Sequence, residues 1–188
     1  MSIMLLNDRR ALVLEQFLEG FDSKKYGREI AKNLKISQKT ISNILNELEK
    51  CHILKYSTEG KNKYYFLNKS NLQLKEIIKL VEINKKIRFL EKNAKLKELF
   101  AQLEIRSNGM CLIFGSYASG KQHAKSDLDI FVIGNIINVK DLEELYGIKI
   151  NIVKSERKKF DKKEVFIKEI IKNHIILKGV EDYIVLVW

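Results

Sequence analysis

The sequence predicts an α+β protein with two domains joined by a long helical segment. Three observations lead to this prediction. Residues 1–69 show helical spacing of apolar residues that gives way to two short strand-like runs. Residues 70–104 consist almost entirely of helix-forming residue types, and the chain of 188 residues has no proline. Residues 105–188 alternate short apolar runs with helical stretches, so we expect strands and helices to share the second domain.

The composition favours a polyanionic partner. The net charge is +11, and 45% of the residues are hydrophobic, which is enough to build real cores. Residues 21–65 hold ten Lys or Arg against five Asp or Glu, whereas residues 105–188 hold fourteen against eleven. Positive charge is therefore densest in the N-terminal half. No apolar run approaches the length of a membrane span, so we expect no membrane partner.

The charged residues near the N-terminus and the two cysteines together predict a cytoplasmic protein. Asp8, Arg9 and Arg10 interrupt the apolar start too early for a signal peptide. Cys51 and Cys111 lie far apart among apolar residues, and their spacing fits neither a metal site nor a redox motif. We therefore expect buried, reduced thiols and a cytosolic location.

Three helices are predicted in the N-terminal domain. They span residues 8–20, residues 26–34 and a third stretch that Ser37 caps. The third helix has one apolar face at helical spacing, formed by Ile41, Ile44, Leu45 and Leu48. Its opposite face carries polar side chains: Gln38, Lys39, Ser42, Asn43 and Asn46.

A β-hairpin is predicted after the third helix, with strands at residues 53–57 and 63–67 and Gly60 in the turn. Three helices followed by a hairpin, with REIAKNLKISQKTISNILNELEKCHILKY at the centre, resemble the winged helix-turn-helix domain of many small prokaryotic DNA-binding regulators. The resemblance implies a role in transcription regulation, with the third helix in the major groove of DNA. The alternatives are an ordinary solvated helix face, or a winged helix used for protein contact.

The same resemblance implies which side chains contact DNA. Gln and Asn on the polar helix face can pair bidentately with adenine, and lysines of the hairpin can meet phosphate. The implied DNA-binding residues are Gln38, Lys39, Ser42, Asn43 and Asn46 on the helix, with Lys61 and Lys63 on the wing.

The connecting segment carries an apolar stripe that a break near Asn93 divides. Its members are Leu74, Ile77, Ile78, Val81, Ile87, Leu90 and Ala94, then Leu96, Leu99, Phe100 and Leu103. Two interpretations fit this stripe. The helix pairs with its copy in a homodimer, as winged-helix regulators commonly do to read two half-sites, or it packs on its own domain.

In the second domain, a buried strand is predicted at residues 110–114, where apolar residues follow one another. Gly115 and Ser116 end it. Glycine allows a ligand to approach the backbone closely, and Ser116 is a good N-cap for a short helix. A helix N-terminus opened by small residues is a phosphate site.

A second strand is predicted at residues 126–133, SDLDIFVI. Side chains at i and i+2 of a strand share a face, so Asp127 and Asp129 project together while Leu128 and Ile130 point into a core. Two adjacent carboxylates repel each other unless a cation lies between them. Mg²⁺ is the hard cation that suits oxygen ligands beside phosphates.

Together these residues resemble the signature of the DNA polymerase β-like nucleotidyltransferases in their minimal form: Gly115, Ser116, Gly120, Ser126, Asp127 and Asp129. The resemblance implies a small mixed sheet, catalytic and metal-binding roles for both aspartates, Mg²⁺ or Mn²⁺ as cofactor, and an NTP as substrate or ligand. Gly115 and Ser116 would hold its phosphates, with added charge from Lys121. The alternative is a Gly/Ser turn followed by two exposed acids on an edge strand.

One position departs from that family. The third acid belongs on the next strand, residues 148–153, and falls at Asn151. An amide oxygen can still ligate a metal, but an amide adds no negative charge and is a very poor general base. Lys149 on the same strand face weakens metal affinity further.

Two functions of different classes follow. The first is a DNA-binding regulator whose nucleotidyltransferase domain binds nucleotide and Mg²⁺ but has lost or weakened its chemistry. The second is an active enzyme that transfers NMP to a protein or nucleic-acid hydroxyl. The basic run at residues 157–159 is interpreted as a solvated helix end, with nucleic-acid contact as the alternative.

Overall fold

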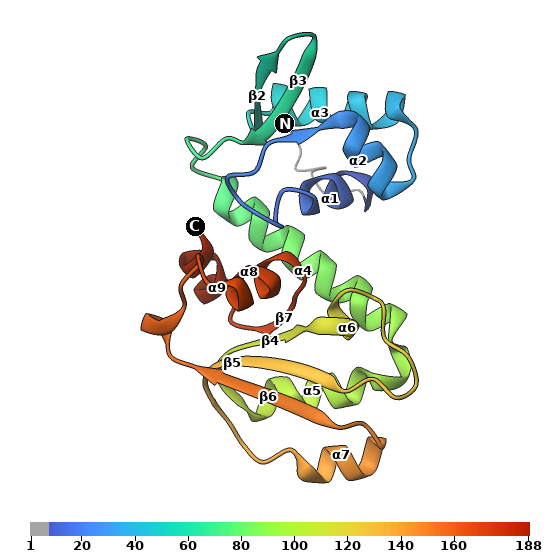
Figure 1. The fold of residues 1–188 in the computed structure, drawn as a ribbon, viewed down its shortest axis with the longest axis vertical. Coiled ribbons are helices and arrows are strands. Elements are labelled where there is room, and N and C mark those ends of the chain that lie inside the picture. The colour runs from blue at the N-terminus through green and yellow to red at the C-terminus, as the bar shows by residue number, and fades with distance from the viewer. Residues whose placement is uncertain (1–7) are drawn as a thin grey trace. The chain divides into compact units, whose positions relative to one another are not determined.

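The computed structural model describes residues 8–188, which divide after Val81 into two compact units (Figure 1). The division falls within one helix, α4 (Leu74–Lys92), inside the segment predicted to connect the domains. Each unit is described by itself. In the described part of the chain, no helix has the length and apolar character needed to cross a membrane.

The N-terminal unit contains three helices and a hairpin in the expected order, together with one short additional strand. The elements are α1 (Asp8–Glu15), β1 (Lys25–Tyr26), α2 (Gly27–Leu34), α3 (Gln38–Lys50), β2 (Leu54–Glu59) and β3 (Asn62–Leu67). The strands form an antiparallel sheet in the order β1-β3-β2. Gly60 takes the left-handed conformation, with φ of 59°, in the turn between β2 and β3.

Helix α3 has the predicted cap and the predicted buried face. Ser37 Oγ accepts a hydrogen bond of 3.2 Å from the Thr40 backbone N–H. The apolar face is buried through Ile41, Ile44, Leu45 and Leu48. In contrast, α1 ends at Glu15 rather than near residue 20, because tight i→i+3 turns follow it and bury Phe17 and Leu18.

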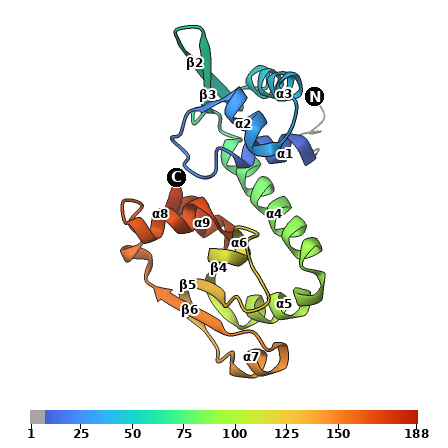
Figure 2. The same cartoon turned by 45° about the vertical axis from the view of Figure 1, so that its right-hand side comes forward.

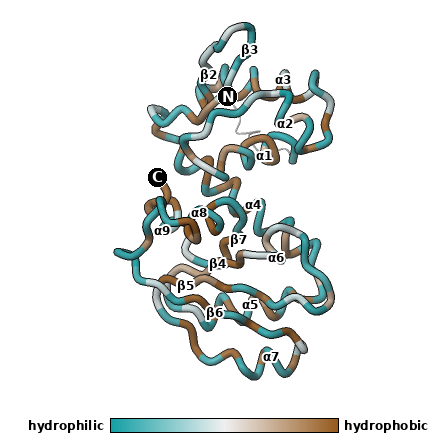
Figure 3. The backbone as a smooth tube through the Cα atoms, viewed as in Figure 1, coloured by the Kyte–Doolittle hydropathy of each residue, from teal (hydrophilic) through white to brown (hydrophobic). Residues whose placement is uncertain are grey.

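The C-terminal unit is a four-stranded mixed sheet with helices on both faces, and Figure 2 shows it from a second side. After α4 come η1 (Ala94–Leu96), α5 (Lys97–Arg106), β4 (Ser107–Phe114), α6 (Gly115–Ala118), β5 (Leu128–Ile136), α7 (Lys140–Tyr146), β6 (Ile150–Ser155), η2 (Arg157–Lys159), α8 (Val165–Lys172), β7 (Ile175–Lys178) and α9 (Val180–Val187). The strand order is β6-β5-β4-β7, and only β5 and β6 run parallel. Apolar stretches run along β4, β5 and β7 (Figure 3).

The two faces of this sheet have different cover. On one face, Leu128 and Ile130 of β5 are fully buried in a cluster with Phe100 and Leu103 of α5 and Leu142 of α7. On the other face, the ring of Phe131 lies 6.1 Å from that of Phe166 in α8. The predicted break near Asn93 is confirmed, since α4 ends at Lys92 and Asn93 Nδ2 donates to the Phe89 carbonyl oxygen at 2.8 Å.

Several predictions about single side chains are wrong. Cys51 is exposed because it follows the last turn of α3, and only Cys111 is buried. Burial raises the pKa of the Cys111 thiol to about 11, so this thiol stays protonated. The apolar spacing of residues 139–146 predicts a helix with Leu142 and Leu145 facing inward. Leu145 is instead 73% exposed, because Leu142 and Tyr146, one helical turn apart, are the residues of α7 that face the core.

The stripe of the connecting segment is also only partly buried. Leu74, Ile77, Ile78 and Val81 are buried, whereas Ile87 is 50% exposed and Ala94 is exposed. Phe89 takes the inward position instead, with its ring 5.0 Å from that of Phe100. One face of α4 in this region therefore stays open to solvent.

The C-terminal unit buries an ionisable cluster that the sequence patterns did not indicate. Glu82 Oε1 lies 3.2 Å from His174 Nε2, and the Tyr183 hydroxyl lies 3.3 Å from His174 Nδ1. Burial disfavours the charged carboxylate, yet Lys85 and His174 together lower the pKa of Glu82 to about 2. Burial lowers the pKa of His174, and Lys85 adds to this effect. The cluster ties α4 to the end of α8 and to α9.

Candidate functional site

Three side chains from two neighbouring strands converge at one end of the C-terminal sheet. Asp127 is the last residue of the loop before β5, and Asp129 is the second residue of that strand. Asn151 of β6 pairs with Asp129 in the parallel register. Leu128 and Ile130, which alternate with the acids, are fully buried on the opposite face. The shared face predicted for the two aspartates is therefore what the strand geometry produces.

The amide of Asn151 bridges the two carboxylates. Its Nδ2 donates hydrogen bonds of 3.2 Å to Asp127 Oδ2 and 3.1 Å to Asp129 Oδ1. Lys149 adds a weak, exposed ion pair, with its Nζ 3.8 Å from Asp127 Oδ2. Repulsion between adjacent carboxylates is thus relieved by an amide donor and a lysine. Rotation of the amide by half a turn would present its oxygen at the same place.

Gly115 brings the backbone directly against the acid pair. Its φ is 68°, and a Cβ atom there would overlap Asp129 Oδ2. Phe114, just before it, pairs with Asp129 across the β4–β5 ladder. A side chain at this position would therefore force both a strained backbone and a displaced carboxylate, which explains the glycine in physical terms.

Ser116 lies inside the first turn of α6 and does not cap it, contrary to the prediction. Phe114 is the N-cap residue, and no side chain caps this four-residue helix. The Ser116 carbonyl oxygen accepts a hydrogen bond of 2.9 Å from the Lys121 backbone N–H. The side chain of Lys121 is exposed.

The loop between α6 and β5 is fixed by its own hydrogen bonds and by the end of α4. Ser126 Oγ accepts a bond of 2.9 Å from the His123 backbone N–H. Gln122 Nε2 donates to Asn93 Oδ1 at 3.1 Å. Lys92 reaches the same loop, since a Cβ atom on Gly120 would lie 3.2 Å from its Nζ. Lys92 gave no signal in the sequence, because it stands far from the motif along the chain.

The donor set suits a hard divalent cation. Two carboxylates and an amide oxygen are the oxygen ligands that Mg²⁺ takes, and water can complete the shell because Asp127 is 43% exposed. Among residues 8–188, no three His, Cys, Asp or Glu side chains gather closely enough to hold a metal. The site thus consists of an acid pair with Asn151 at the third position. Asp127, Asp129 and Asn151 would hold the cation.

The predicted DNA-contacting residues all lie on the surface of the N-terminal unit. On α3, all five predicted residues are exposed: Gln38, Lys39, Ser42, Asn43 and Asn46. Asn46 is partly engaged, because its Oδ1 accepts a hydrogen bond of 3.0 Å from the Tyr65 hydroxyl. On the hairpin, Lys61 is exposed, and the Lys63 ammonium stands 4.1 Å from the centre of the Tyr56 ring.

A comparison with protein families gives a match that is consistent with the acid pair, the Gly-Ser turn and the mixed sheet. Residues 94–182 match the family described as Polymerase beta, Nucleotidyltransferase. The C-terminal unit contains a nucleotidyltransferase-like domain. No curated protein matches the chain. A similar solved structure is described as "Crystal structure of the toxin-antitoxin with AMP-PNP", with 21% identity, 55% of this chain and 77% of that chain covered, and a TM-score of 0.34.

Proposed function

We propose that this chain is a DNA-binding winged-helix regulator whose nucleotidyltransferase-like domain binds an NTP through Mg²⁺ and has weakened transfer chemistry. The observation that carries the proposal is the contact of Asn151 Nδ2 with both Asp127 and Asp129. In this arrangement a neutral amide occupies the position where the resembling enzymes have a third acid.

The nucleotide would be held at three points. Asp127 and Asp129 hold the cation, which neutralises the phosphates and aligns them. Gly115 lies against Asp129, and the backbone N–H groups of Gly115 and Ser116 would bind phosphate oxygens, with added positive charge from Lys121. The cation must displace the amide donor of Asn151 or turn it so that its oxygen faces the metal.

The weakness of the chemistry follows from what an amide is unable to do. Transfer requires an acceptor hydroxyl to lose its proton as its oxygen attacks the α-phosphorus atom and pyrophosphate leaves. A carboxylate at position 151 would add negative charge to the metal site and could accept that proton. The amide of Asn151 does neither.

DNA binding is supported by the shape and charge of the N-terminal unit. An exposed polar face on a capped α3, followed by a hairpin with Lys61 near its tip, has the order expected of a winged helix. The excess of lysine and arginine over residues 21–65 suits the phosphate backbone.

A homodimer is supported by an exposed apolar stripe on α4. Leu80, Ile83 and Ile87 are each 42–50% exposed and follow one another at helical spacing. Such a stripe can pair with its copy and bring two winged helices to adjacent half-sites. The cytoplasm, where DNA and NTPs are present, is the compartment that this proposal requires.

The second candidate function is an active Mg²⁺- or Mn²⁺-dependent nucleotidyltransferase with a protein or nucleic-acid hydroxyl as acceptor. It is favoured by the intact approach of Gly115 to Asp129 and by the two aspartates on one face. Under this function the winged helix directs the enzyme to its acceptor.

Transfer of labelled α-phosphate from each of the four NTPs, with Mg²⁺ or Mn²⁺, tests the proposal. We expect little transfer by the wild type, at least tenfold more by Asn151→Asp, and none by Asp127→Ala. Calorimetry should detect binding of NTP with Mg²⁺ to the wild type and no binding to Asp127→Ala. Equal transfer and binding by all three proteins would exclude this site. Strong transfer by the wild type would establish the enzyme instead.

A further inference from the structure

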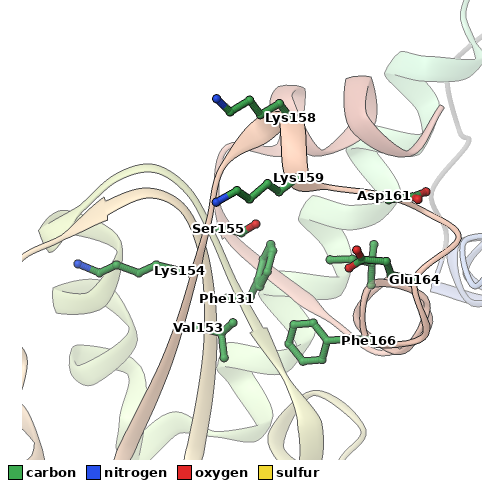
Figure 4. A pocket seen from close by; sticks show the side chains of 10 residues that line it. Phe131, Val153, Lys154, Ser155, Lys158, Lys159, Asp161, Glu164 and Phe166 are labelled. Carbon is green, nitrogen blue, oxygen red and sulfur yellow. The ribbon is translucent and has the colours of Figure 1, made fainter.

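An open pocket of about 420 Å³ lies against β5, β6 and α8 (Figure 4). Its strand residues lie on the sheet face of Asp129 and Asn151, because residues two apart on a strand share a face. Phe131 follows Asp129 by two residues on β5, and Val153 follows Asn151 by two residues on β6. Phe131 and Val153 are register partners, and both line the pocket. Two residues of strand span about 7 Å, so a ligand in the pocket would lie within one nucleotide's reach of the carboxylates.

An exposed aromatic ring forms one wall of this pocket. Phe166 is 42% exposed, although large apolar side chains are normally buried. Its ring meets Phe114 edge-on, at 5.6 Å and 88°, and meets Phe131 at 6.1 Å and 61°. These two contacts fix the ring through its neighbours and leave part of it open. Such a ring is a platform for a flat ligand.

The polar groups around the platform are separated by charge. The ammonium groups of Lys154, Lys158 and Lys159 lie on one side, and the carboxylate of Glu164 lies on the other (Figure 4). Within residues 8–188, Lys158 and Lys159 form ion pairs with the exposed carboxylate of Glu156, at 3.4 and 3.3 Å, and with no other side chain. Exposed pairs of this kind are worth little, so phosphate can replace Glu156 at small cost.

A ligand that satisfies both sides needs an anionic group, a flat ring and a hydrogen-bond donor on the ring's far edge. A nucleotide whose base carries an exocyclic amino group has these three features in this order. Phosphate meets lysine, the base stacks on an aromatic ring, and the amino group donates to a carboxylate. Uracil and thymine present a carbonyl oxygen where cytosine presents its amino group, so Glu164 would repel them.

We propose that this pocket binds one nucleotide of a single-stranded nucleic acid, with an amino-bearing base on Phe166, its amino group at Glu164 and its phosphates at Lys158 and Lys159. The phosphates of an NTP have their own position at Gly115 and Ser116. Under the second candidate function, the active transferase, the strand in the pocket would supply the acceptor hydroxyl. That consequence rests on the enzyme being active, whereas the binding of the strand does not.

Fluorescence anisotropy of labelled eight-nucleotide oligo(rC) and oligo(rU), with the full chain and no NTP or metal, tests this proposal. We expect the wild type to bind oligo(rC) more tightly than oligo(rU). Phe166→Ala should weaken oligo(rC) binding about tenfold or more, and Phe166→Trp should restore it. Glu164→Gln should reduce the preference for oligo(rC).

Charge variants distinguish binding in the pocket from non-specific electrostatic binding to the basic surface. Lys158→Glu with Lys159→Glu should weaken both strands and lower the salt dependence of binding by roughly 1.4, from two lost phosphate contacts. Lys163→Glu with Lys168→Glu is the matched control, because it makes the same two changes at exposed positions outside the pocket lining. Thermal melts of each variant check that the fold is retained. If Lys39→Ala weakened oligo(rC) binding as much as Phe166→Ala does, strand binding would belong to α3 and the proposal would be overturned.

Three results would overturn the assignment of the pocket. The first is unchanged binding of both strands by Phe166→Ala and Glu164→Gln. The second is displacement of the strand by Mg²⁺-NTP together with loss of NTP binding in Phe166→Ala, which would make the pocket the nucleoside site of the NTP. The third is tighter capture of an acidic, tyrosine-containing peptide than of oligo(rC). Strand binding by a wild type that transfers no label would leave this proposal standing while the enzyme fails.

Discussion

The two polar surfaces of this protein are built in different ways. On α3, every polar side chain of the predicted DNA face belongs to a single helix and projects into solvent. In the C-terminal unit, the acid pair depends on Gly115 after β4, Asp129 on β5 and Asn151 on β6. Changes on the first surface should therefore alter binding without altering the fold. Changes at the residues that build the acid pair should alter both.

The buried ionic cluster should give the largest effect. Glu82→Gln leaves His174 and Lys85 without their carboxylate, so we expect the free energy of unfolding to fall by about 3 kcal/mol. Urea unfolding measures this loss. Glu76→Gln is the matched control, since Glu76 forms an exposed i,i+3 pair with Lys79 on the same helix. Equal losses of unfolding free energy in the two variants would mean that the buried cluster stabilises the fold no more than an exposed ion pair does.

The pH dependence of the same pair has a definite sign. The folded-state pKa of Glu82, about 2, lies below its ordinary value of 4.5. The stability that ionised Glu82 provides is therefore complete above about pH 4.5 and is lost as the pH falls towards 2. The stability difference between wild type and Glu82→Gln should shrink over that range.

Two glycines separate backbone strain from the crowding of the acid pair. Gly115 and Gly147 both have positive φ, at 68° and 63°, but a Cβ atom at Gly147 would meet nothing within 4 Å. We expect Gly147→Ala to cost about 1 kcal/mol and Gly115→Ala about 2 kcal/mol, as measured by urea unfolding. Gly115→Ala should also abolish binding of Mg²⁺-NTP, whereas Gly147→Ala should retain it. If both variants bind alike, the close approach to Asp129 has no role in the site.

The α3 surface should give the smallest effect on stability and a clear effect on binding. Lys39→Ala with Lys61→Ala removes two exposed side chains, so we expect unfolding free energy to change by less than about 0.5 kcal/mol. Affinity for duplex DNA should fall, and the salt slope of binding should decrease by about 2. Lys97→Ala, an exposed lysine on α5, is the control. Identical DNA binding by the double variant and the control would remove α3 and the hairpin from the interface.

Local patterns were sufficient for features that depend on one element. The cap at Ser37, the buried face of α3, the break near Asn93 and the alternation of Asp127, Leu128 and Asp129 follow from spacing along the chain. Apolar residues at position 145 of α7 and position 87 of α4 misled the same reasoning. Whether such a side chain is buried depends on which face of its helix meets a neighbour, and spacing leaves two candidate faces.

The sequence by itself determined that an acid pair stands on one face of a strand after a Gly-Ser turn, and that position 151 has an amide. Only the tertiary structure decided what these groups do to one another. Strand pairing sets Asn151 Nδ2 between the two carboxylates, and the same pairing aligns Phe131 with Val153 beside Phe166. The physical reason is that a hydrogen bond or a stacking surface needs atoms within a few ångströms. Residues far apart in the chain reach that distance only through the register of the sheet and the packing of α8 on its face.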